Sequence, residues 1–246
     1  MVKQTGLGDN LYVDGYDLSG DIGSLSRIGG GPAAMPVTGI NKSAMERIGG
    51  IKDGAMAFTS WFNDAASQEH AILSALPTTD VIVSYFRGTT IAGPAAGITA
   101  KQLNYDPTRG TDGSLTIDVE VVANGFGLDW GKMLTAGIRT DSGAGNGTAV
   151  DFLADADLGF QAYLHVFAFT GTDATVTIQD SANGSSGWAA VQAFTAISSG
   201  PTSERIATGR TENVKRFLRV NVATSGGFSD LQYAVLANQN VTDTQL

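Results

Sequence analysis

The sequence predicts a mainly β protein, and three observations support this fold class. Residues 114–123 alternate apolar and polar side chains, the pattern of a strand with one buried face. Glycine accounts for 32 of 246 residues, and it supplies the positive backbone angles that tight turns require. Only 16% of the residues are charged, against about 25% in an average soluble protein. Short strands joined by many tight turns would produce this balance.

The first half contains strong strand patterns. Residues 11–13 form the first expected strand, and Asp14-Gly15 favours a type I′ hairpin turn after it. Further strands are expected at residues 56–62, 80–87 and 114–123. In the last of these, Asp118 and Glu120 lie opposite the apolar face, so both carboxylates are expected to meet water.

One helix is expected, over residues 65–76. Asp64 is a suitable N-cap, Glu69 lies in the early turns where the helix dipole favours an acid, and Pro77 prevents continuation. Apolar residues recur on one side at helical spacing.

Residues 29–54 are expected to form a long loop, because they are rich in glycine and show weak periodicity. Long loops in compact domains are usually functional or disordered. Its sparse apolar content cannot offset the entropy of ordering it alone, so we expect no order there before assembly. The charged residues of this loop are Lys42, Glu46, Arg47, Lys52 and Asp53.

A glycine-rich segment divides the chain. We expect a first β domain at residues 1–140, a linker at 141–149, and a second, small β-sandwich domain at 150–246. The strands expected in the second domain are residues 160–169, 174–179, 189–195, 204–208, 216–222 and 231–236.

Charge and composition exclude several functions. The net charge is −9 and both halves are acidic, which argues against DNA reading. Cysteine is absent, so disulfides and cysteine-based metal sites are excluded. No segment approaches the ~20 apolar residues of a membrane span, and no signal segment opens the chain, so no membrane anchor is expected.

The residues offer little for catalysis. The two histidines, His70 and His165, lie in a predicted helix and mid-strand, where structural roles are expected. Asp151, Asp155 and Asp157 would suit either Ca²⁺ or, in the favoured interpretation, a solvated turn. The sequence therefore predicts no enzyme, no catalytic residue, no metal and no cofactor.

Two aromatic residues of the second half leave an alternative open. Trp188 follows an Asn-Gly turn, and together with Tyr163 it would form a platform for stacking a sugar. Packing within the core or on a sheet is the favoured interpretation of both side chains.

The order of features in the first half resembles a known family. Residues 10–20 (NLYVDGYDLSG) are similar to the opening strand of tail tube proteins of long-tailed bacteriophages. The long loop, a strand, the helix and residues 113–120 (GSLTIDVE) follow in the family's order. Over residues 5–140 the chain therefore resembles a siphovirus-type major tail tube protein, which implies a tail-tube-like β-sandwich or barrel with one flanking helix.

This resemblance implies a structural role. Copies of the chain would close into hexameric rings with a continuous inner β-barrel, and the rings would stack into a tube through loop 29–54. Lys42, Glu46, Arg47, Lys52 and Asp53 become inter-ring candidates, and Asp118 and Glu120 become candidates for the lumen. DNA would pass without sequence-specific binding. Further partners would be other phage tail proteins, in a virion built in the bacterial cytoplasm.

The second half resembles β-sandwich domains appended to virion proteins, through residues 176–184 (VTIQDSANG), Trp188 and residues 216–220 (RFLRV). This implies a domain on the outer surface of the tube. The alternatives are another virion component, such as a head-decoration or tail-tip protein, and a carbohydrate-binding module.

Overall fold

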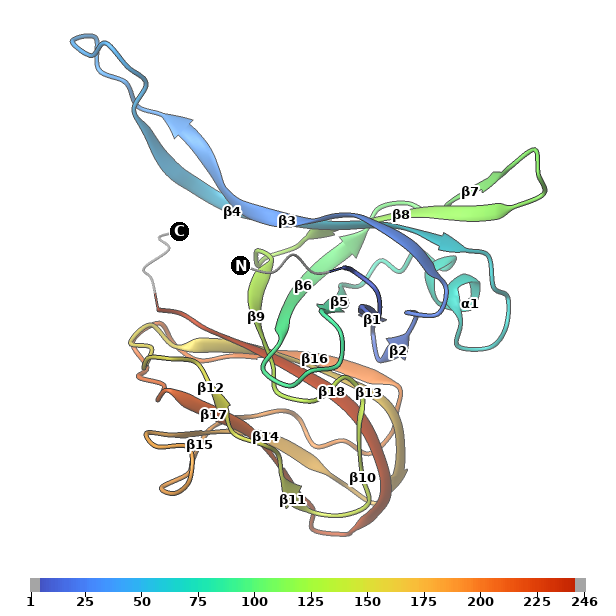
Figure 1. Cartoon of the computed structure of the whole chain (residues 1–246), viewed down its shortest axis with the longest axis vertical. Coiled ribbons are helices and arrows are strands. Elements are labelled where there is room, and N and C mark those ends of the chain that lie inside the picture. The colour runs from blue at the N-terminus through green and yellow to red at the C-terminus, as the bar shows by residue number, and fades with distance from the viewer. Residues whose placement is uncertain (1–4, 242–246) are drawn as a thin grey trace.

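The fold is built almost entirely of strands, as predicted. The computed structural model describes residues 5–241, and its one helix in that range is the short α1 (Glu69–Leu73). Figure 1 shows two bodies, one above the other, with a long hairpin projecting from the upper one. No helix among the described residues is long and apolar enough to cross a membrane.

The strands of the first half are β1 (Asn10–Val13), β2 (Tyr16–Asp17), β3 (Ile22–Pro36), β4 (Arg47–Trp61), β5 (Val81–Phe86), β6 (Pro94–Gln102), β7 (Asp106–Arg109), β8 (Leu115–Ala123) and β9 (Asp129–Met133). Those that follow are β10 (Arg139–Asp141), β11 (Gly145–Asn146), β12 (Val150–Asp151), β13 (Phe160–Gly171), β14 (Thr175–Ser181), β15 (Ala189–Ala193), β16 (Thr202–Ala207), β17 (Phe217–Ala223) and β18 (Phe228–Gln239).

Two sheets contain these strands, and neither closes into a barrel. The main path of the larger sheet runs β16-β13-β18-β9-β6-β5-β1-β2, with β3, β4, β8, β7 and β10 joined beside it. The smaller sheet runs β11-β17-β14-β15, with β12 beside β17. The larger sheet therefore passes from one half of the chain into the other, at the pairing of β9 with β6 and β18.

Each half has its own hydrophobic core. In the first half, the sheet curls around buried side chains from β1, β4, β5, β6 and β8, with Leu73 of α1 against them. In the second half, the larger and smaller sheets enclose a core from β13, β14, β17 and β18, which forms the predicted β-sandwich. The strands expected there are all present, with ends shifted by a few residues.

The predicted helix at 65–76 is wrong in length. Helix α1 spans Glu69–Leu73, and its N-cap is Gln68, not Asp64. Ser67 and Leu76 have positive φ angles of 64° and 45°, which lie outside right-handed helical geometry and confine the helix between them.

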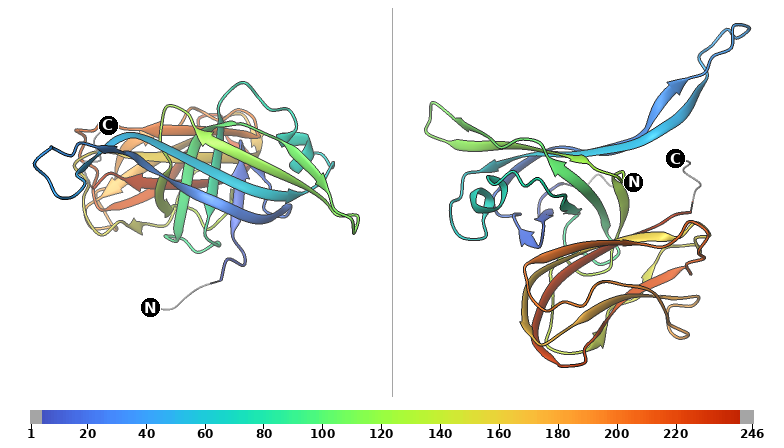
Figure 2. Two further views of the ribbon diagram at one scale, coloured as in Figure 1. Left: turned by 90° about the horizontal axis from the view of Figure 1, so that it is seen from above. Right: turned by 180° about the vertical axis from the view of Figure 1, so that it is seen from behind.

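The predicted loop at 29–54 is also wrong. Strands β3 and β4 pair along their whole length, from Ile22 opposite Ser60 to Pro36 opposite Arg47, so only residues 37–46 connect them. We call residues 30–53 the arm, because β8 pairs with β4 only from Ala55 onward. Figure 2 shows the arm extending well beyond the body.

The predicted linker at 141–149 is held at two places. Arg139–Asp141 pairs with β18, and Gly145–Asn146 pairs with β17. The segment therefore joins the larger sheet to the smaller one, and one of its glycines, Gly145, begins β11. The division of the chain into domains at this segment stays a prediction.

A buried seam joins the two halves. Tyr12 and Phe86 of the first half pack in one cluster with Tyr163 and Leu236 of the second half. At its centre, Nδ1 of the fully buried His165 accepts a hydrogen bond from the Gly15 N–H at 3.1 Å. The neutral ring therefore carries its proton on Nε2, which lies 2.9 Å from the Ser84 hydroxyl oxygen.

The turn between β1 and β2 reinforces this seam. Asp14 and Gly15 have φ angles of 47° and 83° and connect the paired residues Val13 and Tyr16, which confirms the predicted hairpin turn. The Asp14 carboxylate accepts hydrogen bonds from the Ile82 N–H at 2.7 Å and the Ser203 hydroxyl at 2.9 Å. One tight turn thereby binds strands from both halves.

Candidate assembly surfaces

The first candidate surface is the solvent-facing side of β3, β4, β8 and β7, which lie side by side in that order. Residues directly opposite one another on this side form rows across the strands. One row is Ser24, Thr59, Asp118 and Asp106, and the next contains Arg27, Ala57 and Glu120. The reverse side carries Phe58, Val119 and other core residues. We call the solvent-facing side the polar face.

Asp118 and Glu120 lie on the polar face, as their alternation with apolar residues predicts. Asp118 is exposed and accepts a hydrogen bond from the Thr59 hydroxyl at 2.7 Å. Glu120 lies 3.8 Å from the guanidinium of Arg27. Asp106 stands directly opposite Asp118, which places two acids on neighbouring strands. Like charges in this position repel, so the polar face concentrates negative charge.

Both outer edges of this group of strands are open. Within residues 5–241, β3 pairs with β4 alone and β7 pairs with β8 alone. An unpaired strand edge presents backbone N–H and C=O groups that another strand can use. Both edges offer backbone groups for strand addition by other copies or other proteins, and β7 offers fewer because it is short and Pro107 has no backbone N–H.

The arm is the second candidate surface. It is a two-stranded ribbon, and its exposed apolar side chains are Met35, Val37, Ile40, Met45, Ile48 and Ile51. Met35 stands directly opposite Ile48 across the ribbon. Such a cluster on a projecting hairpin is typical of a protein interaction site.

The charged residues predicted for inter-ring contact separate along the arm. Lys42 and Glu46 form an ion pair at 2.9 Å near the tip, and Arg47 begins β4 beside them. Lys52 and Asp53 lie instead at the root, where they line a cleft. The structure therefore places three of the five predicted residues at the tip. Their contact role stays a prediction.

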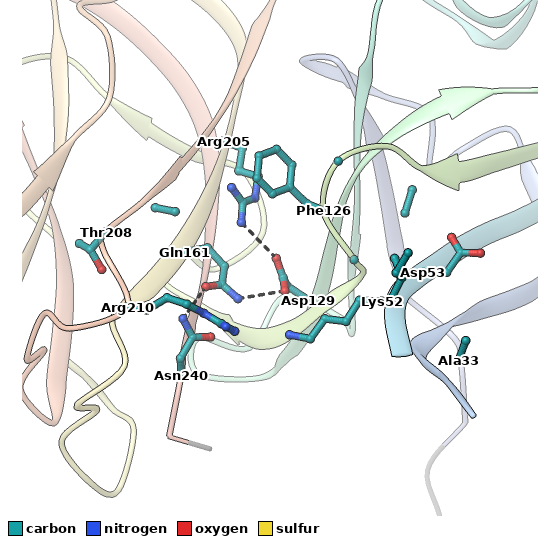
Figure 3. Close-up of a pocket in the computed structure, with 15 residues that line it drawn as sticks. Ala33, Lys52, Asp53, Phe126, Asp129, Gln161, Arg205, Thr208, Arg210 and Asn240 are labelled. Atoms are coloured by element: carbon teal, nitrogen blue, oxygen red, sulfur yellow. Dashed lines mark hydrogen bonds and ion pairs between the residues drawn. The ribbon is translucent and has the colours of Figure 1, made fainter. Parts of the chain in front are cut away.

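The cleft at the arm root has a volume of about 650 Å³ and separates the arm from the second half. Figure 3 shows its floor, where hydrogen bonds run from Asn240 to Gln161 and from Gln161 to Asp129. Arg205 lies 3.8 Å from Asp129, and its guanidinium also lies 3.8 Å from the ring centre of Phe126. Most polar groups of the floor thus already have partners within the protein.

The structure contradicts the alternative of a sugar platform and agrees with the favoured interpretation of packing for Tyr163. Tyr163 is fully buried in the seam, and its hydroxyl donates to Asp129 at 2.6 Å, so its ring has no free face for a sugar. Burial raises the pKa of Tyr163, and the neighbouring Asp129 raises it further. Trp188 instead packs against the guanidinium of Arg219, 4.2 Å away, beside the smaller sheet.

The acidic cluster of the second half is engaged by protein groups. Asp151 receives two hydrogen bonds of 2.6 Å from Arg216, and hydrogen bonding to this arginine lowers the pKa of Asp151 to about 2. Asp155 accepts the Arg216 N–H, and Asp157 accepts the side-chain amide of Asn213. In the described part of the chain, no group of three or more histidine, cysteine or acidic side chains is arranged to hold a metal ion.

The contact between the two halves could not be predicted from the sequence. Gly15 lies in the expected Asp14-Gly15 turn, but it is far along the chain from His165 and Ser84, and no motif connects the three residues. The complete burial of His165 between the two halves agrees with the structural role that its position in the sequence predicts. His70 contacts the Tyr105 hydroxyl at 2.7 Å beside α1.

Comparisons with known proteins give matches to solved structures alone. No family model matches the chain, and no curated protein matches it. A chain of the virion of a native gene transfer agent particle has 15% identity and a TM-score of 0.43, covering 52% of this chain and 98% of that chain. The Dit hub protein of phage SPP1 has 11% identity and a TM-score of 0.34, with coverage of 94% and 98%. A chain of the phage p2 baseplate has 8% identity and a TM-score of 0.32, covering 94% of this chain and 98% of that chain.

Proposed function

We propose that this chain is a non-enzymatic structural subunit of a phage tail, and that its copies form stacked hexameric rings through which DNA passes. The observation that carries this proposal is the arrangement of β3, β4, β8 and β7. One polar, acid-bearing face is combined with an open edge at each side. A ring of copies needs two complementary edges and one face that can line a channel.

Ring closure would proceed by pairing of the open edges. Neighbouring strands alternate in direction from β3 to β7, so β7 of one copy meets β3 of the next copy antiparallel. Closing the edges in this way removes the aggregation hazard of unpaired strands. The inner wall would then carry Asp118, Glu120 and Asp106, whose negative charge repels the phosphates of DNA.

The arm would connect one ring to the next. The arm projects beyond the body and its apolar side chains are exposed. An isolated two-stranded hairpin is only marginally stable in water. Contact with a second ring would bury these side chains and stabilise the pairing of β3 with β4. Hydrogen exchange in the monomer would test whether this pairing holds before assembly.

Negative-stain electron microscopy of the purified protein, with size-exclusion chromatography over a range of concentrations, tests the proposal. Hollow tubes or rings of uniform diameter are the expected result. A monomer at every concentration, with no rings after prolonged incubation, would contradict it.

Replacing Ile40 by aspartate should shorten or abolish tubes while leaving single rings intact. Ile40 is fully exposed at the tip, so the change removes no contact inside one copy, and the unfolding free energy should stay within about 0.5 kcal/mol of the original. Leu153→Asp is the matched control, because Leu153 is also largely exposed but lies in the second half. If Ile40→Asp formed tubes of normal length, the arm would take no part in ring stacking.

A second candidate function is a single ring at the tip of a tail. The observation that favours it is the position of the second half, whose Arg205 and Thr208 face the arm root across the cleft. The second half of the chain lies beside the arm, and its volume would limit how closely two rings can approach one another. Single rings that never stack, seen in the same micrographs, would favour this candidate.

A further inference from the structure

Asp106 is an acid on an open edge with an unfavourable neighbour. It lies on the polar face of β7 directly opposite Asp118, and both side chains are exposed. Its carboxylate accepts one hydrogen bond, from the Asn104 amide at 2.6 Å. Within residues 5–241 neither aspartate forms an ion pair with a basic residue. A cation arriving at the free side of β7 would relieve the repulsion between them.

Arg27 is a cation on the other open edge. It is the sole charged residue of β3, and more than half of its side chain is exposed. Its nearest acid is Glu120, at 3.8 Å, which is a long and solvent-exposed ion pair of little strength. Its contact with Glu120 places it on the polar face, the same side as Asp106.

We propose that Arg27 of one copy pairs with Asp106 of the next copy, and that this ion pair selects the edges and the register by which copies join. The inference rests on the proposed ring and names the residues that close it. The partner is a second copy of this chain, because the two edges carry opposite charges on the same face.

The register of the strands agrees with this pairing. Asp106 belongs to the row of Ser24, and Arg27 belongs to the next row on the same face. Joining copies into a closed barrel requires a stagger between neighbours, and the stagger must be an even number of residues to keep the polar face on one side. A long arginine side chain reaches both the directly opposite and the diagonal position across a strand pair.

The same charges disfavour wrong assemblies. Pairing of β7 with another β7 in a register centred on Asp106 would bring two copies of Asp106 together, and pairing of β3 with another β3 centred on Arg27 would do the same for Arg27. Like charges across an interface suppress such partners. Arg109, the other charged end of β7, stands opposite Leu115 on the reverse side and takes no part.

Charge reversal in the full chain tests the inference. Arg27→Asp and Asp106→Arg should each raise the concentration at which half of the protein is assembled by about tenfold or more at low salt. The double variant, which restores opposite charges and the original net charge, should return to within about threefold of the unaltered protein. Arg109→Asp is the matched control, because it changes charge on the same strand but on the reverse side, and it should assemble normally.

The outcomes are distinct. Assembly of the unaltered protein together with normal assembly of both single variants would overturn the ion pair and leave the proposed function standing. Loss of assembly in the single variants without recovery in the double variant would also overturn it. An unaltered protein that never assembles would overturn both the proposed function and the inference. Thermal unfolding of each variant checks that the fold is retained, since both side chains are exposed.

Discussion

Replacing Gly15 by alanine should lower the free energy of unfolding by about 3 kcal/mol. A methyl group at this position would lie 2.6 Å from the backbone of Thr202 and from the carbonyl oxygen of Val166. Backbone atoms of a sheet cannot move aside cheaply, and the φ of 83° is itself strained for alanine. The displacement of the backbone around the added methyl group would also weaken the hydrogen bond from the Gly15 N–H to His165. Urea unfolding followed by tryptophan fluorescence measures the change.

Gly8→Ala is the matched control for this prediction. Gly8 also has a φ of 83°, but no atom lies within 4 Å of the place where its methyl group would stand. The Gly8→Ala variant should therefore lose about 1 kcal/mol of unfolding free energy, which is the cost of the positive φ angle alone. If both variants lost the same unfolding free energy, the two halves would not be closely packed at Gly15.

Strands with one buried face could be predicted closely from the sequence. Strand β8 begins one residue after the expected start and ends at the expected residue, because its alternating side chains separate core from solvent. The same alternation places Asp118 and Glu120 on the solvent side correctly. Apolar and polar side chains alternate at every second residue when one face of a strand is buried and the other is in water, so the sequence shows directly which residues are buried.

The arm could not be predicted by this rule, because both of its faces meet solvent. From Gly30 outward, β3 is exposed at every position, so no alternation arises. Its order comes from pairing of two backbones, which leaves no pattern in the side chains. Glycine and small residues then look like a loop.

Strand β13 presents the opposite case. Its residues Phe160–Val166 are all buried, since one face packs in the core of the second half and the other packs in the seam. A strand covered on both faces also lacks alternation. The sequence therefore left a surface role for Tyr163 open as an alternative, and the burial of its ring agrees with the favoured interpretation of packing.

The stability of the protein should fall as the pH is lowered from 8 to 5, by about 2 kcal/mol from His165 alone. Burial lowers the pKa of His165 from 6.5 to about 3. Below pH 6.5 the unfolded chain takes up a proton at this position and the folded chain does not, so unfolding becomes easier as protons become abundant. The stability that the neutral ring contributes is complete above pH 6.5 and is lost progressively toward pH 3.

Two carboxyl groups oppose this trend. Burial raises the pKa of Asp14, which faces the seam, and of Glu69, the first residue of α1. Each contributes stability that grows as the pH falls through its raised pKa, so both offset part of the histidine effect at the acid end. Comparison of a His165 variant with the unaltered protein isolates the contribution of the histidine, because both carboxyl groups are present in each protein.

His165→Gln should lose about 2 kcal/mol less unfolding free energy between pH 8 and pH 5 than the unaltered protein does. The glutamine amide can accept a hydrogen bond from Gly15 and donate one to Ser84, so the seam keeps its partners while losing the titrating group. His70→Gln is the matched control, because it removes the other histidine without touching the seam. Urea unfolding at several pH values measures both. If the pH dependence of stability in His165→Gln equalled that of the unaltered protein, protonation of His165 would not be the cause of the loss of stability at low pH.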